Sequence, residues 1–149
     1  METQQINRLI DLLNKRSDKI ESIQNFEDHF DKFVRYTLMN VVEKVNDVLT
    51  PKTNESFRIF LENPYETSKA RYSIMVQLMS EQYRKNSFQF DNSKNLPSLI
   101  FEGDEFTGSV KVWTIFKNKK FGSYYDIDKL DESKTFDILL EFIDDIYKN

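Results

Sequence analysis

The chain has 149 residues, a formal net charge of −4, a single histidine and no cysteine. The lack of cysteine excludes disulfides, thiolate metal sites and cysteine nucleophiles, and favours a cytoplasmic location. Mixed charges give no overall basic field for nucleic acid, the three glycines form no phosphate-binding loop, and no apolar run approaches the roughly 18 residues of a membrane span.

Residues 1–24 have the apolar spacing of a helix. A short heptad seam runs along it, with Arg16 where a further apolar residue is expected. The seam residues are Ile6, Leu9, Leu13, Ile20 and Ile23. We expect residues 1–149 to form a single domain in which 1–24 is a helical extension that mediates oligomerisation or packs on the rest of the protein.

A second helix, or a continuation of the first, is predicted from about Asn25 to Leu49. It carries a phenylalanine stripe that begins at Phe26, and it is expected to end before Pro51, whose ring disfavours helix at Thr50. The core of the protein should therefore begin near Phe26.

The only histidine, His29, lies among three carboxylates in "NFEDHFDKF". Its helical neighbours at three and four residues include no carboxylate, so this helix alone provides no histidine-carboxylate metal pair. We expect His29 to flank the phenylalanine stripe and cover its edge.

Glu27 and Asp31 share their helical azimuth with Val45 and Leu38 further along the chain. If that face is buried along its whole length, one carboxylate pKa should rise. The preferred alternative is that the helix leaves the body of the protein before residue 31.

Six short runs rich in aromatic and β-branched residues follow, and they predict strands. They are "SFRIFLE", "RYSIMVQLM", "SFQFD", "SLIFE", "SVKVWTIFK" and "SYYDI". Their connections are too short for crossover helices, so the sheet should be an antiparallel meander of five or six strands. Residues 131–147 predict a C-terminal helix packed on this sheet, with Asp131 or Ser133 as N-cap, which makes the fold α+β.

The predicted strands are apolar on both faces, whereas a meander covered by helices on one side should be polar on the other. The second apolar surface consists of Phe60, Met75, Met79, Trp113 and Ile115. A helix covering it, a surface for a protein partner, and a small-molecule cavity between sheet and helix all remain open explanations.

Few residues suggest chemistry. The acidic turn "EGDE", with Glu102, Asp104 and Glu105, is interpreted as a solvated turn, with a divalent-ion loop as the alternative. We assign no catalytic, cofactor-binding or metal-binding residue and expect no cofactor.

The leading hypothesis is a non-catalytic intracellular protein-interaction protein: an adaptor, a specific chaperone, or a toxin-neutralising or inhibitory protein. Its partner would be another protein or a second copy in a homodimer, and neither nucleic acid nor membrane is expected. The alternatives are a module that binds a small apolar ligand and, less favoured, a metal-dependent enzyme such as a nuclease that uses the Glu102–Glu105 loop.

Overall fold

The computed structural model describes residues 2–60, 72–80, 96–116 and 119–148. Its helices are α1 (Thr3–Gln24), α2 (Phe26–Lys32), the π-helix η1 (Phe33–Leu38), α3 (Met39–Thr53), the 3₁₀ helix η3 (Ile127–Lys129) and α5 (Glu132–Lys148). Its strands are β1 (Glu55–Phe60), β2 (Tyr72–Ser80), β3 (Ser98–Asp104), β4 (Ser109–Phe116) and β5 (Lys119–Asp126). Helices at both ends of the chain enclose the strands in sequence, which confirms the predicted α+β fold.

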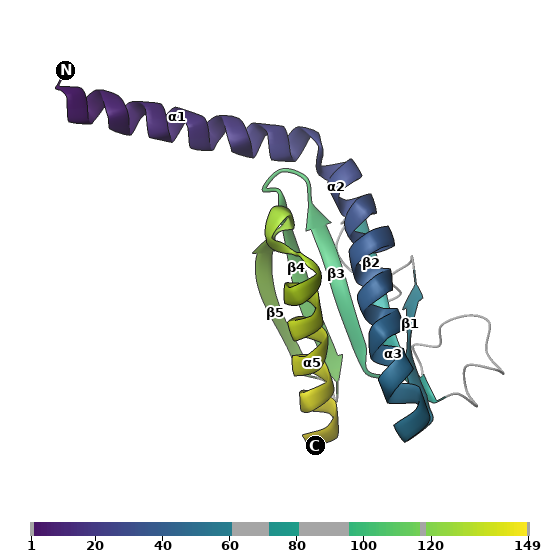
Figure 1. The fold of residues 1–149 in the computed structure, drawn as a ribbon. Coiled ribbons are helices and arrows are strands. Elements are labelled where there is room, and N and C mark those ends of the chain that lie inside the picture. The colour runs from purple at the N-terminus through teal and green to yellow at the C-terminus, as the bar shows by residue number, and fades with distance from the viewer. Residues whose placement is uncertain (1, 61–71, 81–95, 117–118, 149) are drawn as a thin grey trace.

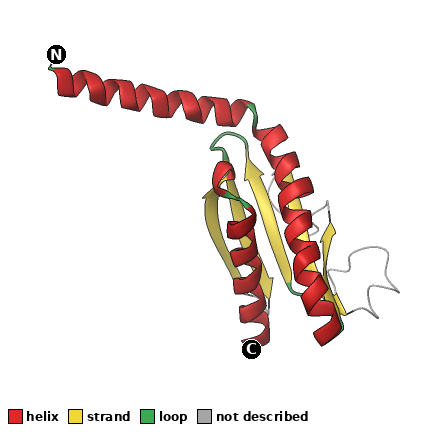
Figure 2. Ribbon diagram, in the orientation of Figure 1, coloured by secondary structure: helices red, strands yellow, loops and turns green. Residues whose placement is uncertain are grey.

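The strands form one sheet in the order β1-β2-β3-β4-β5, and every neighbouring pair is antiparallel. The predicted meander is confirmed with five strands among the described residues, while the strand predicted at 87–91 lies outside them. The continuous run from α2 to α3 lies beside α5 on one face of the sheet (Figures 1 and 2). The fold therefore has two layers.

Alternate strand residues face these helices and form the core. On the central strands they include Val76, Leu99 and Phe101, all of which are completely buried. Aromatic contacts join the layers: the Phe33 ring lies 5.4 Å from that of Phe101. The large side chains fill the space between sheet and helices, so the interior is packed.

The π-helix keeps one face of the long helix directed at the sheet. On a regular α-helix each residue advances about 100° around the helix axis. At this spacing the buried valines of α3 would lie about 100° further around the axis than the buried phenylalanines before them, which is the rotation of one residue. The residues compared are Val41, Val42 and Val45, and Phe26, Phe30 and Phe33. The wider hydrogen-bonding turn of a π-helix accommodates one extra residue, so both groups are buried on the same side.

The ends of the helices follow local capping. Asp131, one of the two N-caps predicted for α5, is the one that the structure shows, because its Oδ1 accepts a hydrogen bond from the Lys134 N–H at 2.8 Å. The predicted end before Pro51 is wrong: α3 continues through Pro51 and stops at Asn54, whose φ is 59°. The Asn54 N–H donates to the Thr50 carbonyl at 2.9 Å, so the turn containing Pro51 is closed from its C-terminal side.

Asn46 of α3 binds the backbone of the edge strand β1. Its Nδ2 donates to the Phe57 carbonyl at 2.9 Å, and its Oδ1 accepts from the Phe57 N–H at 2.8 Å. Both backbone groups are thereby satisfied by a side chain of α3, on the side of β1 where the described residues provide no further strand.

Tyr147 of α5 is bonded to the start of β1. Its hydroxyl donates to Glu55 Oε1 at 2.7 Å. Burial of the phenol, followed by this hydrogen bond to Glu55, raises the pKa of Tyr147 to about 12. The neutral phenol therefore stabilises the contact between α5 and β1.

Candidate interaction surfaces

Helix α1 projects away from the two layers (Figure 1). Every side chain from Glu2 to Glu21 is exposed. Six of them are large apolar residues with relative exposures between 41% and 54%: Ile6, Leu9, Ile10, Leu12, Leu13 and Ile20. We call these six residues the α1 stripe. Most of the predicted seam belongs to it, and only Ile23, next to the body, is half-buried.

The junction between α1 and α2 is held by Asn25 and Phe26. The Asn25 Nδ2 and backbone N–H both donate to the Glu21 carbonyl, at 3.0 and 3.1 Å, which closes α1. Phe26 is completely buried, with its ring 5.2 Å from that of Tyr72. A Cβ at Gly103 would lie only 2.6 Å from Phe26 Cζ, so the absence of a side chain there makes room for this ring. The buried core therefore begins at Phe26, directly after α1, and the α1 stripe lies outside it.

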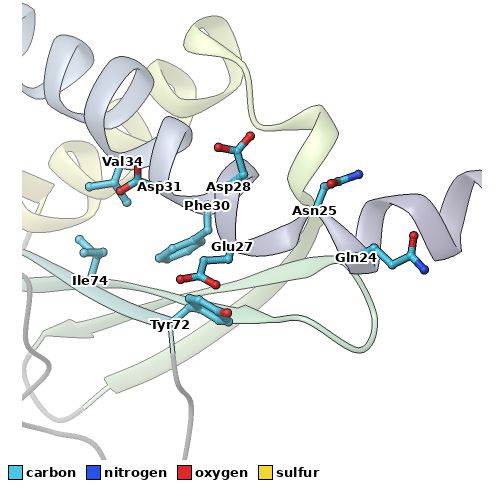
Figure 3. Close-up of a pocket in the computed structure, with 9 residues that line it drawn as sticks. All are labelled: Gln24, Asn25, Glu27, Asp28, Phe30, Asp31, Val34, Tyr72 and Ile74. Carbon is cyan, nitrogen blue, oxygen red and sulfur yellow. The ribbon is translucent and has the colours of Figure 1, made fainter.

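A cleft of about 640 Å³ lies beside this junction, between α2 and the start of β2 (Figure 3). Phe30, Val34, Tyr72 and Ile74 supply its apolar surface, while Glu27, Asp28 and Asp31 supply carboxylates. In Figure 3 the Glu27 side chain extends towards Tyr72, and that of Asp28 points away from it. The cleft thus has an aromatic floor and an acidic rim.

Two of the three carboxylates are already paired on their own helix. Asp28 accepts from Lys32 Nζ at 2.9 Å, and Asp31 from Arg35 Nε at 3.0 Å. The hydrogen bond that Lys32 donates to Asp28, together with the negative charge of that carboxylate, raises the pKa of Lys32. Glu27 has no ion-pair partner within the described chain, so it is the carboxylate of the rim that is available to a cationic group.

Glu27 and Asp31 are both exposed, so the interpretation of carboxylates buried beside Val45 does not hold. The alternative, that the helix leaves the body before residue 31, is also wrong, because Phe26 and Phe30 are buried. Both interpretations assumed a regular helix from residue 27 to residue 45. The extra residue in η1 rotates Val45 away from the azimuth of Glu27, so Val45 is buried while Glu27 is exposed.

His29 is half-buried at the edge of the phenylalanine stripe, as expected. Its Nδ1 lies 3.5 Å from Oδ1 of Asp128 in η3. The two residues are far apart in sequence, so a helical-wheel argument could not identify this carboxylate. This contact joins α2 to η3. Among the described residues, no third histidine, cysteine, aspartate or glutamate lies close enough for the pair to hold a metal ion.

The face of the sheet opposite the helices is partly buried. Met75 and Met79 are 0% and 2% exposed, whereas Phe60, Trp113 and Ile115 are half-buried. The register places Phe60, Met75 and Trp113 in one row across the strands, through Ile100. Binding of a protein partner at this predicted surface stays a prediction, and the two methionines contribute little accessible area to it.

The three carboxylates of the "EGDE" turn point to different places. Glu102 is on the sheet face away from the helices, opposite Lys111 of β4. Asp104 Oδ1 accepts from the Phe106 N–H at 2.9 Å, and Glu105 accepts from the Tyr72 hydroxyl at 3.4 Å. Across the described ranges, no group of three histidine, aspartate, glutamate or cysteine residues is close enough to hold a metal ion.

A second groove, of about 440 Å³, lies between α5 and the β4-β5 side of the sheet. Leu99, Val112 and Phe142 line it together with the carboxylates of Glu141 and Asp145. The cleft beside α2 and this second groove both have charged rims, which suit a small apolar ligand poorly.

No family model, curated protein or solved structure matches this chain. Among the helices of the described residues, none combines the length and apolar character that crossing a bilayer requires.

Proposed function

We propose that this chain is a non-catalytic, intracellular protein-interaction protein whose binding element is α1. The observation that carries the proposal is the exposure of the α1 stripe. Six leucine and isoleucine side chains lie on one helix at 41–54% exposure, and no element of the described chain covers them. A contiguous apolar patch of this kind on a projecting element is typical of a surface that another chain covers.

The contrast between α1 and the rest of the chain supports this proposal. The buried phenylalanines of α2 and η1 pack against the sheet, so the protein forms its core without α1. Most helical stability in proteins comes from the packing of an apolar face and not from intrinsic propensity, and the α1 stripe has no such packing within the described chain. A partner that covers the stripe would supply that packing.

Site-specific photo-crosslinking in cells of the source organism tests the proposal. A photoreactive phenylalanine analogue placed at Leu13, within the stripe, is expected to give covalent adducts with a defined protein. The same analogue at Asn14 is the matched control, because Asn14 lies on the polar side of the same turn. Adducts from Leu13 and not from Asn14 support an interaction surface, whereas equal or absent adducts contradict it.

A further inference from the structure

We propose that α1 pairs in an antiparallel orientation with α1 of a second copy of this chain. This inference rests on the proposed function, because it names the partner that covers the α1 stripe.

The seam is self-complementary when the two helices run in opposite directions. A register that places Ile6 opposite Ile23 of the second copy also places Leu9 opposite Ile20. It places Leu13 opposite Arg16 as well. Each layer then joins an a position to a d position, which is the pairing that an antiparallel coiled coil requires. A single register therefore satisfies all six seam positions.

Arg16 decides between the two orientations. In a parallel pair each residue faces its own copy, so two Arg16 guanidinium groups would meet inside the seam. Like charges at a buried layer are destabilising. In the antiparallel pair the aliphatic part of Arg16 covers Leu13 of the second copy while its guanidinium extends to solvent.

The charge of α1 favours a copy of the same chain over a nucleic acid or an anionic membrane. Four basic and four acidic side chains balance each other between residues 2 and 24. They are Arg8, Lys15, Arg16 and Lys19, and Glu2, Asp11, Asp18 and Glu21. Helices that bind anionic surfaces have an excess of lysine and arginine on their polar face. A neutral helix has no such attraction, and two neutral copies do not repel each other.

The projection of α1 leaves room for this pairing. The helix has 22 residues, so it is about 33 Å long. Figure 1 shows the layered body at the C-terminal end of α1. Antiparallel pairing therefore places the two sheets at opposite ends of the helix pair. A stable interface buries at least about 1,000 Å², and three heptads lie near that limit. We therefore expect a dissociation constant in the micromolar range.

Disulfide mapping tests the orientation directly, because the natural chain has no cysteine. Full-length Leu9→Cys and Ile20→Cys, one of them carrying a tag, are mixed and oxidised in a glutathione buffer. The antiparallel register brings position 9 of one chain opposite position 20 of the other. Two copies of position 9 are then about 16 Å apart along the axis, too far for a disulfide. Mixed disulfides should form in excess over either homodimer.

A pair of outward positions is the matched control. Asn7→Cys and Glu21→Cys lie at similar heights but on the polar side of α1, so they should give only random cross-links. A mixed disulfide confined to the stripe pair supports the proposal. Homodimers from each single variant indicate parallel pairing and overturn it, as does cross-linking no greater than that of the control.

Charge variants at Leu13 supply a second measurement that does not depend on cysteine. In the antiparallel register, Leu13→Glu places a carboxylate opposite Arg16 of the second copy, whereas Leu13→Lys places a like charge there. The dimer of Leu13→Lys should dissociate at least about tenfold more readily than that of Leu13→Glu. Sedimentation equilibrium measures both, against the 17.9 kDa of one chain. Equal dissociation constants would contradict the register.

These results separate the inference from the proposed function. If the purified full-length chain stays monomeric while Leu13 cross-links to a different protein in cells, α1 is a binding element but its partner is not a second copy. If Leu13 gives no specific adduct in cells and the purified chain is monomeric, both proposals fail.

Discussion

Single residues determine how α1 is joined to the body. Phe26 is buried at the first turn of α2, and its ring occupies the space that a side chain at position 103 would need. Sequence periodicity predicted that the core begins at Phe26, since the phenylalanine stripe starts there. It could not predict the complementary glycine, because the contact depends on the position of β3 relative to α2.

Gly103→Ala should lower the free energy of unfolding by about 1–3 kcal/mol, because the new methyl group overlaps the Phe26 ring. Urea denaturation measures this loss. Gly122→Ala is the matched control: its Cβ would approach the flexible end of Lys111 at 2.9 Å. It should lose less than about 1 kcal/mol.

The steric origin of the Gly103 effect can be isolated in a second background. In Phe26→Leu the ring is absent, so adding Gly103→Ala should cost clearly less than it does in the natural chain. Losses that simply add in the double variant would show that the two residues do not interact, and the explanation would be wrong.

Tyr147 should make stability depend on pH in the alkaline range. Its pKa is raised to about 12 from the ordinary 10.0, so the folded state favours the neutral phenol. The stabilisation is complete below the unfolded pKa, and it is lost as pH rises from about 10 to about 12. Since Tyr147 is 48% exposed, we expect a loss of at most about 1 kcal/mol after solvent screening. Chemical denaturation at pH 9 and at pH 12 should show this decrease in the natural chain and a smaller one in Tyr147→Phe; equal decreases would contradict it.

At the scale of elements, the π-helix η1 is the feature that sequence reasoning missed. Its buried residues have spacings that suit a regular helix locally, so nothing in a short window indicates an extra residue. The π-helix is indicated only by the difference of about 100° between the helical azimuths of the buried phenylalanines and those of the buried valines. That difference was visible in the sequence, where it made Glu27 appear to share a face with Val45.

Deleting Tyr36 should convert η1 into regular α-helix with little loss of stability. Tyr36 is 71% exposed, and its removal brings the buried residues on both sides into one stripe. We expect the free energy of unfolding to fall by less than about 1 kcal/mol. Deleting Glu43, which is also exposed, should cost more than about 3 kcal/mol because it rotates Val45 and Asn46 away from the sheet. Thermal and urea denaturation of the two variants test this, and equal losses would contradict it.

The strands were easier to predict than the helix geometry. Alternating β-branched and aromatic residues, with short connections, were sufficient for the antiparallel order that β1 to β5 adopt. The contacts between distant segments, such as His29 with Asp128, were beyond the sequence because local periodicity contains no information about them. The cleft beside α2 belongs to this second group, since Tyr72 contributes to it from β2.

At the scale of the whole molecule, we expect the stability of the layered body to be independent of the projecting α1. A chain that starts at Gln24 should keep its free energy of unfolding within about 0.5 kcal/mol of the full chain, compared under dilute conditions. The reason is that no side chain from Glu2 to Glu21 is buried and that Ile23, which the truncation also removes, is only half-buried. Phe26→Ala in the full chain is the contrasting variant and should lose about 3–5 kcal/mol. A large loss in the truncated chain would show that α1 packs on the body.

The hydrogen bonds of Asn46 with Phe57 bear on aggregation. An open sheet edge is a template on which a strand from another molecule can add, and successive additions lead to fibrils. At this point of β1 the amide of Asn46 already occupies both backbone groups, so an incoming strand would first have to displace it. If α1 pairs as we propose, each contact between helices raises the local concentration of the sheets, and the protection of β1 by Asn46 then limits their aggregation.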